Sequence, residues 1–173
     1  MTRRTRRHRT RGRGQAMLEF ALIMPFFLVL AVGAVDFGNY YELRVTAVNA
    51  LRDGARYGTT HPTAWSNAAT AATNSIEGLI QAEGGDPTIV NDDSHMLIAY
   101  YDTSTSPFTE CGYYVATSNS FAALSTYTQA TCVKAGNEIR VQITDSFRPL
   151  VPLANYLPAV NTLVLTYSML EDG

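Results

Sequence analysis

The side chains that could support catalysis or hold a metal ion are few and widely separated. Of the three histidines, His8 lies in an arginine-rich terminus, His61 precedes a proline, and His95 ends the string Asn91-Asp92-Asp93-Ser94-His95. Carboxylates and an imidazole can share a cation, but this string lacks the spacing of a calcium loop or a zinc motif. Asn, Asp and Ser favour a turn here. There is no nucleophile elbow, Walker loop or GxGxxG motif. The sequence therefore predicts no metal or cofactor and no enzymatic activity.

The two cysteines, Cys111 and Cys132, are the remaining candidates for covalent chemistry. Two thiols alone make a poor metal site, and no CxxC spacing exists for redox chemistry. An even number of cysteines in an exported domain indicates a disulfide between them. The uncharged segment that separates them is rich in Tyr, Ser and Thr. It is either a surface that contacts partners or a stabilised insertion, and we favour the insertion.

Charge is distributed very unevenly along the chain. Residues 1–14 carry seven arginines and no acid, whereas the remaining residues carry six basic and fifteen acidic side chains, a balance of −9. Such an arm could bind nucleic acid, form a solvated tail, or be the cytoplasmic flank of a membrane segment. No aromatic side chain interleaves the arginines as a platform for bases. Because an apolar run follows at once, the sequence favours the membrane flank and no nucleic-acid partner.

A membrane-spanning helix is predicted directly after the arm. The run from Phe20 to Val35 contains sixteen residues without a charge, and adding residues 16–18 gives an apolar stretch that only Glu19 interrupts. Twenty helical residues rise about 30 Å, which matches the hydrocarbon thickness of a bilayer. Pro25 removes one helical hydrogen bond, so we expect a bend there and not a helix end.

A secretory signal peptide is the strongest alternative to this anchor. It would be cut after small residues, to leave Ala34 or Val35 as the new N-terminus. However, the stretch from Asp36 to Tyr57 contains no proline and continues the helical pattern. Its apolar residues recur at three- and four-residue steps and form one apolar stripe: Phe37, Tyr41, Val45, Val48, Leu51 and Ala55. An unbroken helix that leaves the membrane favours the anchor.

A carboxylate at the start of a membrane segment is costly, which makes Glu19 a candidate functional residue. The segment Gly14-Gln15-Ala16-Met17-Leu18-Glu19-Phe20 resembles the cleavage motif of type IV prepilins, with a basic leader before it. The resemblance implies that a prepilin peptidase cuts between Gly14 and Gln15. It also implies that Glu19 pairs with the N-terminal amine of a neighbouring subunit. Only correctly staggered subunits would bring these charges together, so Glu19 and Phe20 would set subunit register and assembly.

A longer stretch is similar to TadE-like proteins, the minor-pilin-like (pseudopilin) components of the tight-adherence, Flp-type pilus system. The similarity covers residues 12–58 and 138–172, where a last strand ends near Met169 and Glu171, and it does not cover residues 59–137. It implies a single-pass protein of the bacterial cytoplasmic membrane that acts in pilus assembly and surface adhesion. The implied partners are a prepilin peptidase, other TadE-like or Flp pilus subunits and the inner-membrane assembly platform.

The exported part is expected to be an α+β domain. Residues 65–82 predict a second helix, ended by Gly84-Gly85. Strands are predicted at 96–101, 138–143 and 162–169, with a short fourth at 113–116. Helices followed by strands favour an antiparallel sheet of three or four strands packed on a helix, as in pilin-like folds. The predicted organisation is a cytoplasmic leader at 1–14, a transmembrane helix at 15–36 and an extracytoplasmic domain at 37–173.

Two other functions remain open at this point. One is an uncleaved membrane-anchored binding or adhesion module that uses the segment between the cysteines. The other is a soluble domain released by an ordinary signal peptidase. The three hypotheses predict different mature N-termini: Gln15 for the pilus subunit, Met1 or Thr2 for the anchored module, and Ala34 or Val35 for the secreted domain.

Overall fold

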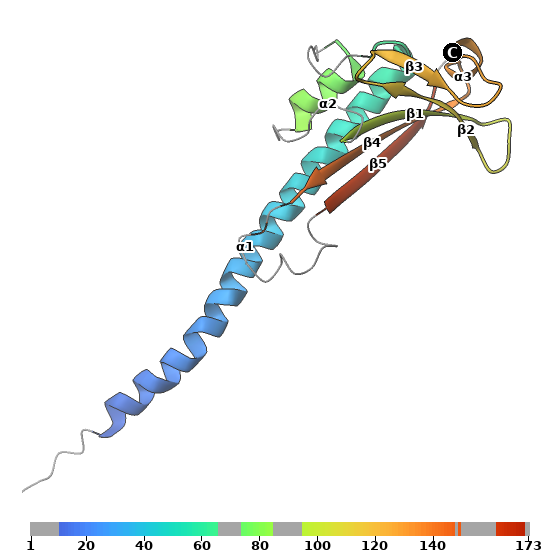
Figure 1. Ribbon diagram of the computed structural model, residues 1–173. Helices are drawn as coiled ribbons and strands as arrows, with labels where there is room; N and C mark the ends of the chain where they lie inside the picture. The colour runs from blue at the N-terminus through green and yellow to red at the C-terminus, as the bar shows by residue number, and fades with distance from the viewer. Residues whose placement is uncertain (1–10, 66–73, 85–94, 148, 150–161, 172–173) are drawn as a thin grey trace, which may run out of the picture.

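A computed structural model describes residues 11–65, 74–84, 95–147, 149 and 162–171. A long N-terminal helix runs into an α+β domain in which a second helix and one antiparallel sheet pack on its C-terminal half (Figure 1). The predicted fold class is therefore confirmed. The elements are the helices α1 (Arg11–Thr60), α2 (Ile76–Gly84) and α3 (Gln129–Cys132), and the strands β1 (Met96–Asp102), β2 (Thr109–Val115), β3 (Ser120–Ala123), β4 (Glu138–Ser146) and β5 (Thr162–Leu170).

Helix α1 is 50 residues long and continues through Pro25, as the apolar pattern predicted. It also continues past Gly58, although a glycine followed closely by Pro62 predicts a helix end at this point of the sequence. The reason is that Gly58 is a packing position: a Cβ at this residue would lie 2.5 Å from Cδ1 of Ile139. The helix ends at Thr60, whose hydroxyl donates to the carbonyl of Tyr57. Pro62 follows, and a proline cannot continue the helical hydrogen bonding.

The second helix is shorter than predicted. Residues 66–73 of the predicted helix lie outside the described residues, and Ala64 and Trp65 are not helical. Helix α2 begins after Ser75, whose hydroxyl accepts a hydrogen bond from the backbone N–H of Gly78 at 3.1 Å. Serine at this position satisfies a backbone donor that the first turn of a helix leaves unpaired. The helix ends at Gly84, as predicted.

The sheet has five antiparallel strands in the order β3-β2-β1-β4-β5, one more than the sequence predicted. All four predicted strands are present, each longer or shifted by a few residues. The strand that the sequence missed is β3, whose four residues pair with β2 inside the segment between the cysteines. In the register, Tyr100 on β1 lies opposite both Gly112 on β2 and Ile139 on β4.

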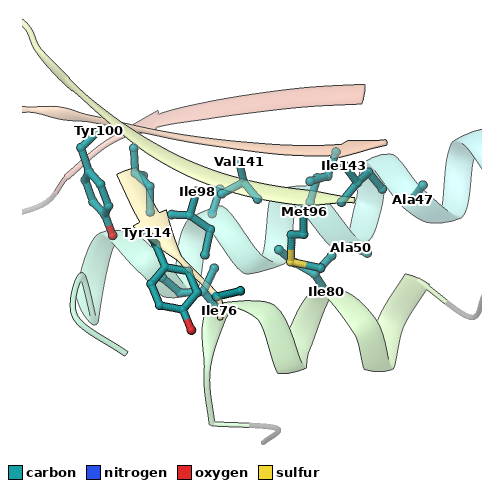
Figure 2. Packing of buried hydrophobic residues seen from close by; sticks show 14 of the residues in the cluster. Ala47, Ala50, Ile76, Ile80, Met96, Ile98, Tyr100, Tyr114, Val141 and Ile143 are labelled. Carbon is teal, nitrogen blue, oxygen red and sulfur yellow. The ribbon is translucent and has the colours of Figure 1, made fainter. Parts of the chain in front are cut away.

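One face of the sheet packs on the helices to form the core. Side chains from β1 and β4 point toward α1 and α2 (Figure 2), among them Ile98 and Val141. Helix α1 meets them mainly with small residues and one leucine: Ala47, Ala50, Leu51 and Ala55. Small side chains let the helix approach α2 and the sheet closely, which explains why glycines also occur on this face.

The apolar stripe that predicted an unbroken helix here lies within α1, and only its last part is buried. Leu51 and Ala55 are buried. However, the larger residues that precede them point away from the core and are exposed: Phe37, Tyr41, Val45 and Val48. The helical recurrence was counted from large apolar residues. On the buried side of α1, the close approach of α2 and the sheet leaves room only for small residues such as Ala47 and Ala50.

An aromatic cluster closes the core at the end of α1. The ring of Trp65 stacks on Tyr114 and Phe121, at centroid distances of 5.4 and 5.9 Å. The indole Nε1 of Trp65 donates to the Tyr100 hydroxyl at 2.9 Å, and this hydroxyl donates to the carbonyl of Pro62 at 2.7 Å. Burial raises the pKa of Tyr100. These contacts tie the segment after α1 to the middle of the sheet.

Candidate functional site

The N-terminal half of α1 is uncovered and apolar. Gly14–Thr60 is long and apolar enough to cross a membrane: its most apolar stretch of 18 residues has a mean hydropathy of 2.4, and none of that stretch is buried. Large side chains such as Phe26, Phe27 and Leu30 are 68%, 64% and 57% exposed. Because water would not favour such a surface, these side chains suit the hydrocarbon of a bilayer. The structure thus contains one helix that could span a membrane among its described residues.

The residues of the predicted processing and assembly site lie together at the start of this helix. Gly14, Gln15, Glu19 and Phe20 are all exposed. The side-chain amide of Gln15 donates to Oε1 of Glu19 at 3.2 Å, because residues four apart lie on one side of a helix. An amide is neutral, so it satisfies a lone pair without neutralising the carboxylate. A cation that approached this side of α1 would meet the charge of Glu19 without displacing packed side chains.

The α+β domain contacts α1 from the point where the apolar run ends. Within the described part of α1, Asp36 is the first buried side chain. One turn later, the ring of Tyr40 contacts Phe147, which follows β4, with a centroid distance of 5.4 Å in an edge-to-face arrangement. The uncovered apolar part of α1 and the domain-bound part therefore adjoin each other without a linker.

The predicted disulfide is present. It joins Cys111 on β2 to Cys132 in α3, with a Cα–Cα distance of 5.6 Å, and both residues are buried. The segment between them contributes to the core, since Tyr114 is buried and Phe121 packs beside it. The Tyr127 hydroxyl donates to Oδ2 of Asp102 at 2.9 Å. The segment between the cysteines thus packs on the core and contains strand β3 and the start of helix α3.

The histidines of the sequence lie apart from one another where they are described. The ring of His61 stacks on Tyr57 at 4.4 Å, and the carbonyl of His95 accepts a hydrogen bond from the backbone of Thr144. His8 and residues 91–94 lie outside the described residues. Across the part of the chain that the structure describes, no three His, Cys, Asp or Glu side chains gather into a metal-binding group.

A hollow of about 310 Å³ lies between α1 and α2 and is open to solvent. Its lining includes Asp53 and Arg56 from α1 and Glu83 from α2. A hydrogen bond between the two carboxyl groups raises the pKa of Glu83, and burial and the charge of Asp53 act in the same direction.

A buried carboxyl group, that of Glu171, lies at the end of β5. The sequence analysis named this residue only because the C-terminal stretch resembles that of TadE-like proteins. Glu171 is 4% exposed, and neither of its carboxylate oxygens has a hydrogen-bond partner among the described residues. Desolvation raises the pKa of Glu171 to about 7. Its backbone pairs with Gly136 and Asn137, so the chain holds the side chain in place. No periodicity in the sequence could show this burial, because β5 alternates and only the sheet contacts decide which face is covered.

Comparison with known proteins gives one match. The family model described as TadE-like protein matches residues 14–56, which cover the predicted cleavage motif, the apolar run and most of the rest of α1. No curated protein and no solved structure matches the chain. Residues 14–56 are thus similar to TadE-like proteins, as the motif around Glu19 predicted.

Proposed function

We propose that this chain is a minor-pilin-like subunit (pseudopilin) of a tight-adherence, Flp-type pilus and secretion system. A prepilin peptidase cuts it between Gly14 and Gln15, and it acts in pilus assembly and surface adhesion from the bacterial cytoplasmic membrane. The observation that carries the proposal is the uninterrupted helix α1, which places Glu19 on an uncovered apolar rod joined directly to an α+β domain. The family match over residues 14–56 supports it.

Glu19 has the role of a register residue in this proposal. A carboxylate in a membrane is expensive, and the neutral amide of Gln15 does not remove that cost. Cleavage after Gly14 would create a new ammonium group on a neighbouring subunit, which can neutralise Glu19 at one stagger only. The partners are accordingly sibling pilus subunits and the inner-membrane platform, and the domain faces outward.

The mature N-terminus is the first test. Full-length protein is purified from the membranes of its native host and its first residue is determined. A start at Gln15 is expected. A start at Ala34 or Val35 would overturn both the anchor and the pilus role, and an intact leader would leave only an anchored module. In the structure, a Cβ at Gly14 meets nothing within 4 Å, so Gly14→Leu should block cleavage without disturbing the fold.

A matched pair of substitutions on α1 tests the role of Glu19. Glu19→Ala should abolish assembly of surface pili while the protein is still made, membrane-bound and folded. Glu42→Ala is the control, because Glu42 is another exposed acid of the same helix that lies beyond the apolar run. Equal pilus numbers for Glu19→Ala and Glu42→Ala would show that Glu19 has no role in assembly.

A further inference from the structure

Glu171 places a carboxyl group on the core side of the sheet, at the point where β5 ends. The side chains of β5 alternate, so that Tyr167 and Met169 pack against the core while Leu170 is exposed. Glu171 continues the row that faces the core and is buried, and neither of its carboxyl oxygens has a hydrogen-bond partner among the described residues. Burial without a partner penalises charge, so a protonated carboxyl group fits this position far better than an ionised one.

The neighbouring strands supply no charge that compensates an ionised Glu171. On β1, Tyr100 is close enough for the charge of Glu171 to raise the pKa of its hydroxyl, which stays neutral at ordinary pH. On β4, Glu138 and Arg140 form an ion pair with each other at 2.8 Å. They flank Ile139, which is buried in the core, and so they point to the other face of the sheet.

The other elements near the end of β5 supply none either. In the same row of β5, Tyr167 is the titratable side chain, and a tyrosine is neutral at ordinary pH. The last charged residues of α1, Asp53 and Arg56, line the hollow beside α2, and His61 after α1 is exposed. Helix α3 carries no charged residue, and Lys134 after it is exposed. Desolvation is accordingly the cause that raises the pKa of the buried carboxyl group, to about 7.

Two backbone hydrogen bonds hold the end of β5 in place. The N–H of Glu171 donates to the carbonyl of Asn137 at 2.7 Å, and the N–H of Gly136 donates to the carbonyl of Glu171 at 3.0 Å. Both partners are also held from elsewhere. The hydroxyl of Thr103 donates to the carbonyl of Gly136 at 2.7 Å, and the side chain of Asn137 donates to the carbonyl of Cys132 at 2.8 Å. Strand β5 lies at the edge of the sheet and pairs only with β4, so its end is the part that can move.

We propose that Glu171 is a pH-sensitive switch that controls the end of β5. While the carboxyl group is protonated, it stays enclosed and the end of β5 remains paired. When the carboxyl group is ionised, the backbone of Glu171 rotates so that the side chain reaches water, and both backbone hydrogen bonds break. This end of the sheet is therefore closed in acidic surroundings and opens increasingly as the pH rises. The switch lies within the α+β domain and does not depend on the proposed function.

The size of the effect follows from the pKa of the carboxyl group in the two forms. The ordinary value of 4.5 applies to the open form, and a value of about 7 applies to the closed form. The open form binds the proton more weakly and is favoured as the pH rises, so the equilibrium constant for opening should increase about 40-fold between pH 5 and pH 7. Above about pH 8 the carboxyl group is ionised in both forms, and the increase stops.

Amide hydrogen exchange of the full-length protein in detergent micelles, followed by NMR, tests the switch. The amides of Gly136 and Glu171 should exchange faster than that of Val141, which lies on an inner strand paired on both sides. After correction for the intrinsic pH dependence of exchange, their opening should increase about 40-fold from pH 5 to pH 7. In Glu171→Gln, whose side chain stays neutral, opening should not change over this range. Glu42→Gln is the control, since it removes an exposed acid of α1 and should keep the full pH dependence.

A carbon NMR titration of the Glu171 carboxyl group in the unchanged protein gives a second measurement that does not rely on any variant. A midpoint of about 7 is expected. A midpoint near the ordinary 4.5, with the amides of Gly136 and Glu171 still protected, would overturn the switch, because the carboxyl group would then ionise within the closed form. The same pH dependence in Glu171→Gln would assign the opening to another group. Exchange of both amides at the rate of Val141 would leave unfolding of the whole domain in place of a local switch.

Discussion

Replacing Gly54 by alanine should weaken the contact between α1 and α2, because the added methyl group enters space that the Ile80 side chain occupies. A Cβ at Gly54 would overlap with Cγ1 and Cδ1 of Ile80 and lie 3.4 Å from the carbonyl oxygen of Ile76. Cγ1 is close to the backbone of α2, so a rotation at the end of the isoleucine does not relieve the overlap. Either α2 moves away from α1 or Ile80 leaves its rotamer.

The expected magnitude follows from two opposing effects. Overpacking a core typically lowers the free energy of unfolding by about 1–3 kcal/mol. Alanine in place of glycine within a helix returns up to about 1 kcal/mol. Gly38→Ala isolates the second effect, because Gly38 lies in the same helix and a Cβ there meets nothing within 4 Å. Gly54→Ala should therefore be less stable than Gly38→Ala by about 1–3 kcal/mol, while Gly38→Ala exceeds the unchanged protein by up to about 1 kcal/mol.

Thermal unfolding of the full-length protein in mild detergent would measure this difference. Trp65 is the one tryptophan of the chain and stacks on Tyr114 and Phe121, so its fluorescence reports on the domain core. For a domain of this size, 1 kcal/mol corresponds to about 4 °C in Tm. The reasoning is refuted if Gly54→Ala raises Tm as much as Gly38→Ala, since α1 and α2 would then not be in close contact at Gly54.

Two further predictions concern the α+β domain. Replacing both Cys111 and Cys132 by alanine should lower the free energy of unfolding by about 3 kcal/mol, from the loop-closure entropy of a disulfide whose cysteines are 21 residues apart, and an unchanged Tm would contradict this. The Glu171 carboxyl has a folded pKa of about 7, above its ordinary value of 4.5, so stability should fall as the pH rises through this interval. Glu171→Gln should flatten the fall in Tm between pH 5 and about pH 8, and an identical slope in both proteins would show that Glu171 does not cause it.

The sequence was most informative where one physical requirement acts on a continuous stretch. Crossing a bilayer needs about twenty apolar residues in a row, and this length is visible without any tertiary contact. The motif that ends in Glu19 is likewise local. The strands of the α+β domain, except β3, were predicted from their apolar content and alternation, and the predicted disulfide followed from the even number of cysteines. For these features the tertiary structure added which strands pair with each other and in which register.

The sequence was least informative where a tertiary contact requires a residue type other than the one that usually marks the feature. The apolar stripe of α1 was read from its large residues, but Ala47, Ala50 and Gly54 make the close contacts, because α2 and the sheet approach too closely for larger side chains. Gly58 was taken as a helix end, although it is a point of close contact with Ile139. Strand β3 is only four residues long and was missed, since its pairing with β2 depends on the fold.

The sequence by itself determined that the chain carries a basic N-terminal arm, a prepilin-like motif and an apolar helix followed by an α+β domain, because composition and local spacing encode these features. Only the tertiary structure decided which side of α1 is buried and which is exposed. It also decided that Glu171 is enclosed and that Trp65 completes the core. Burial depends on how separate elements pack against each other. The residues of a single helix or strand do not by themselves determine which of its sides is buried.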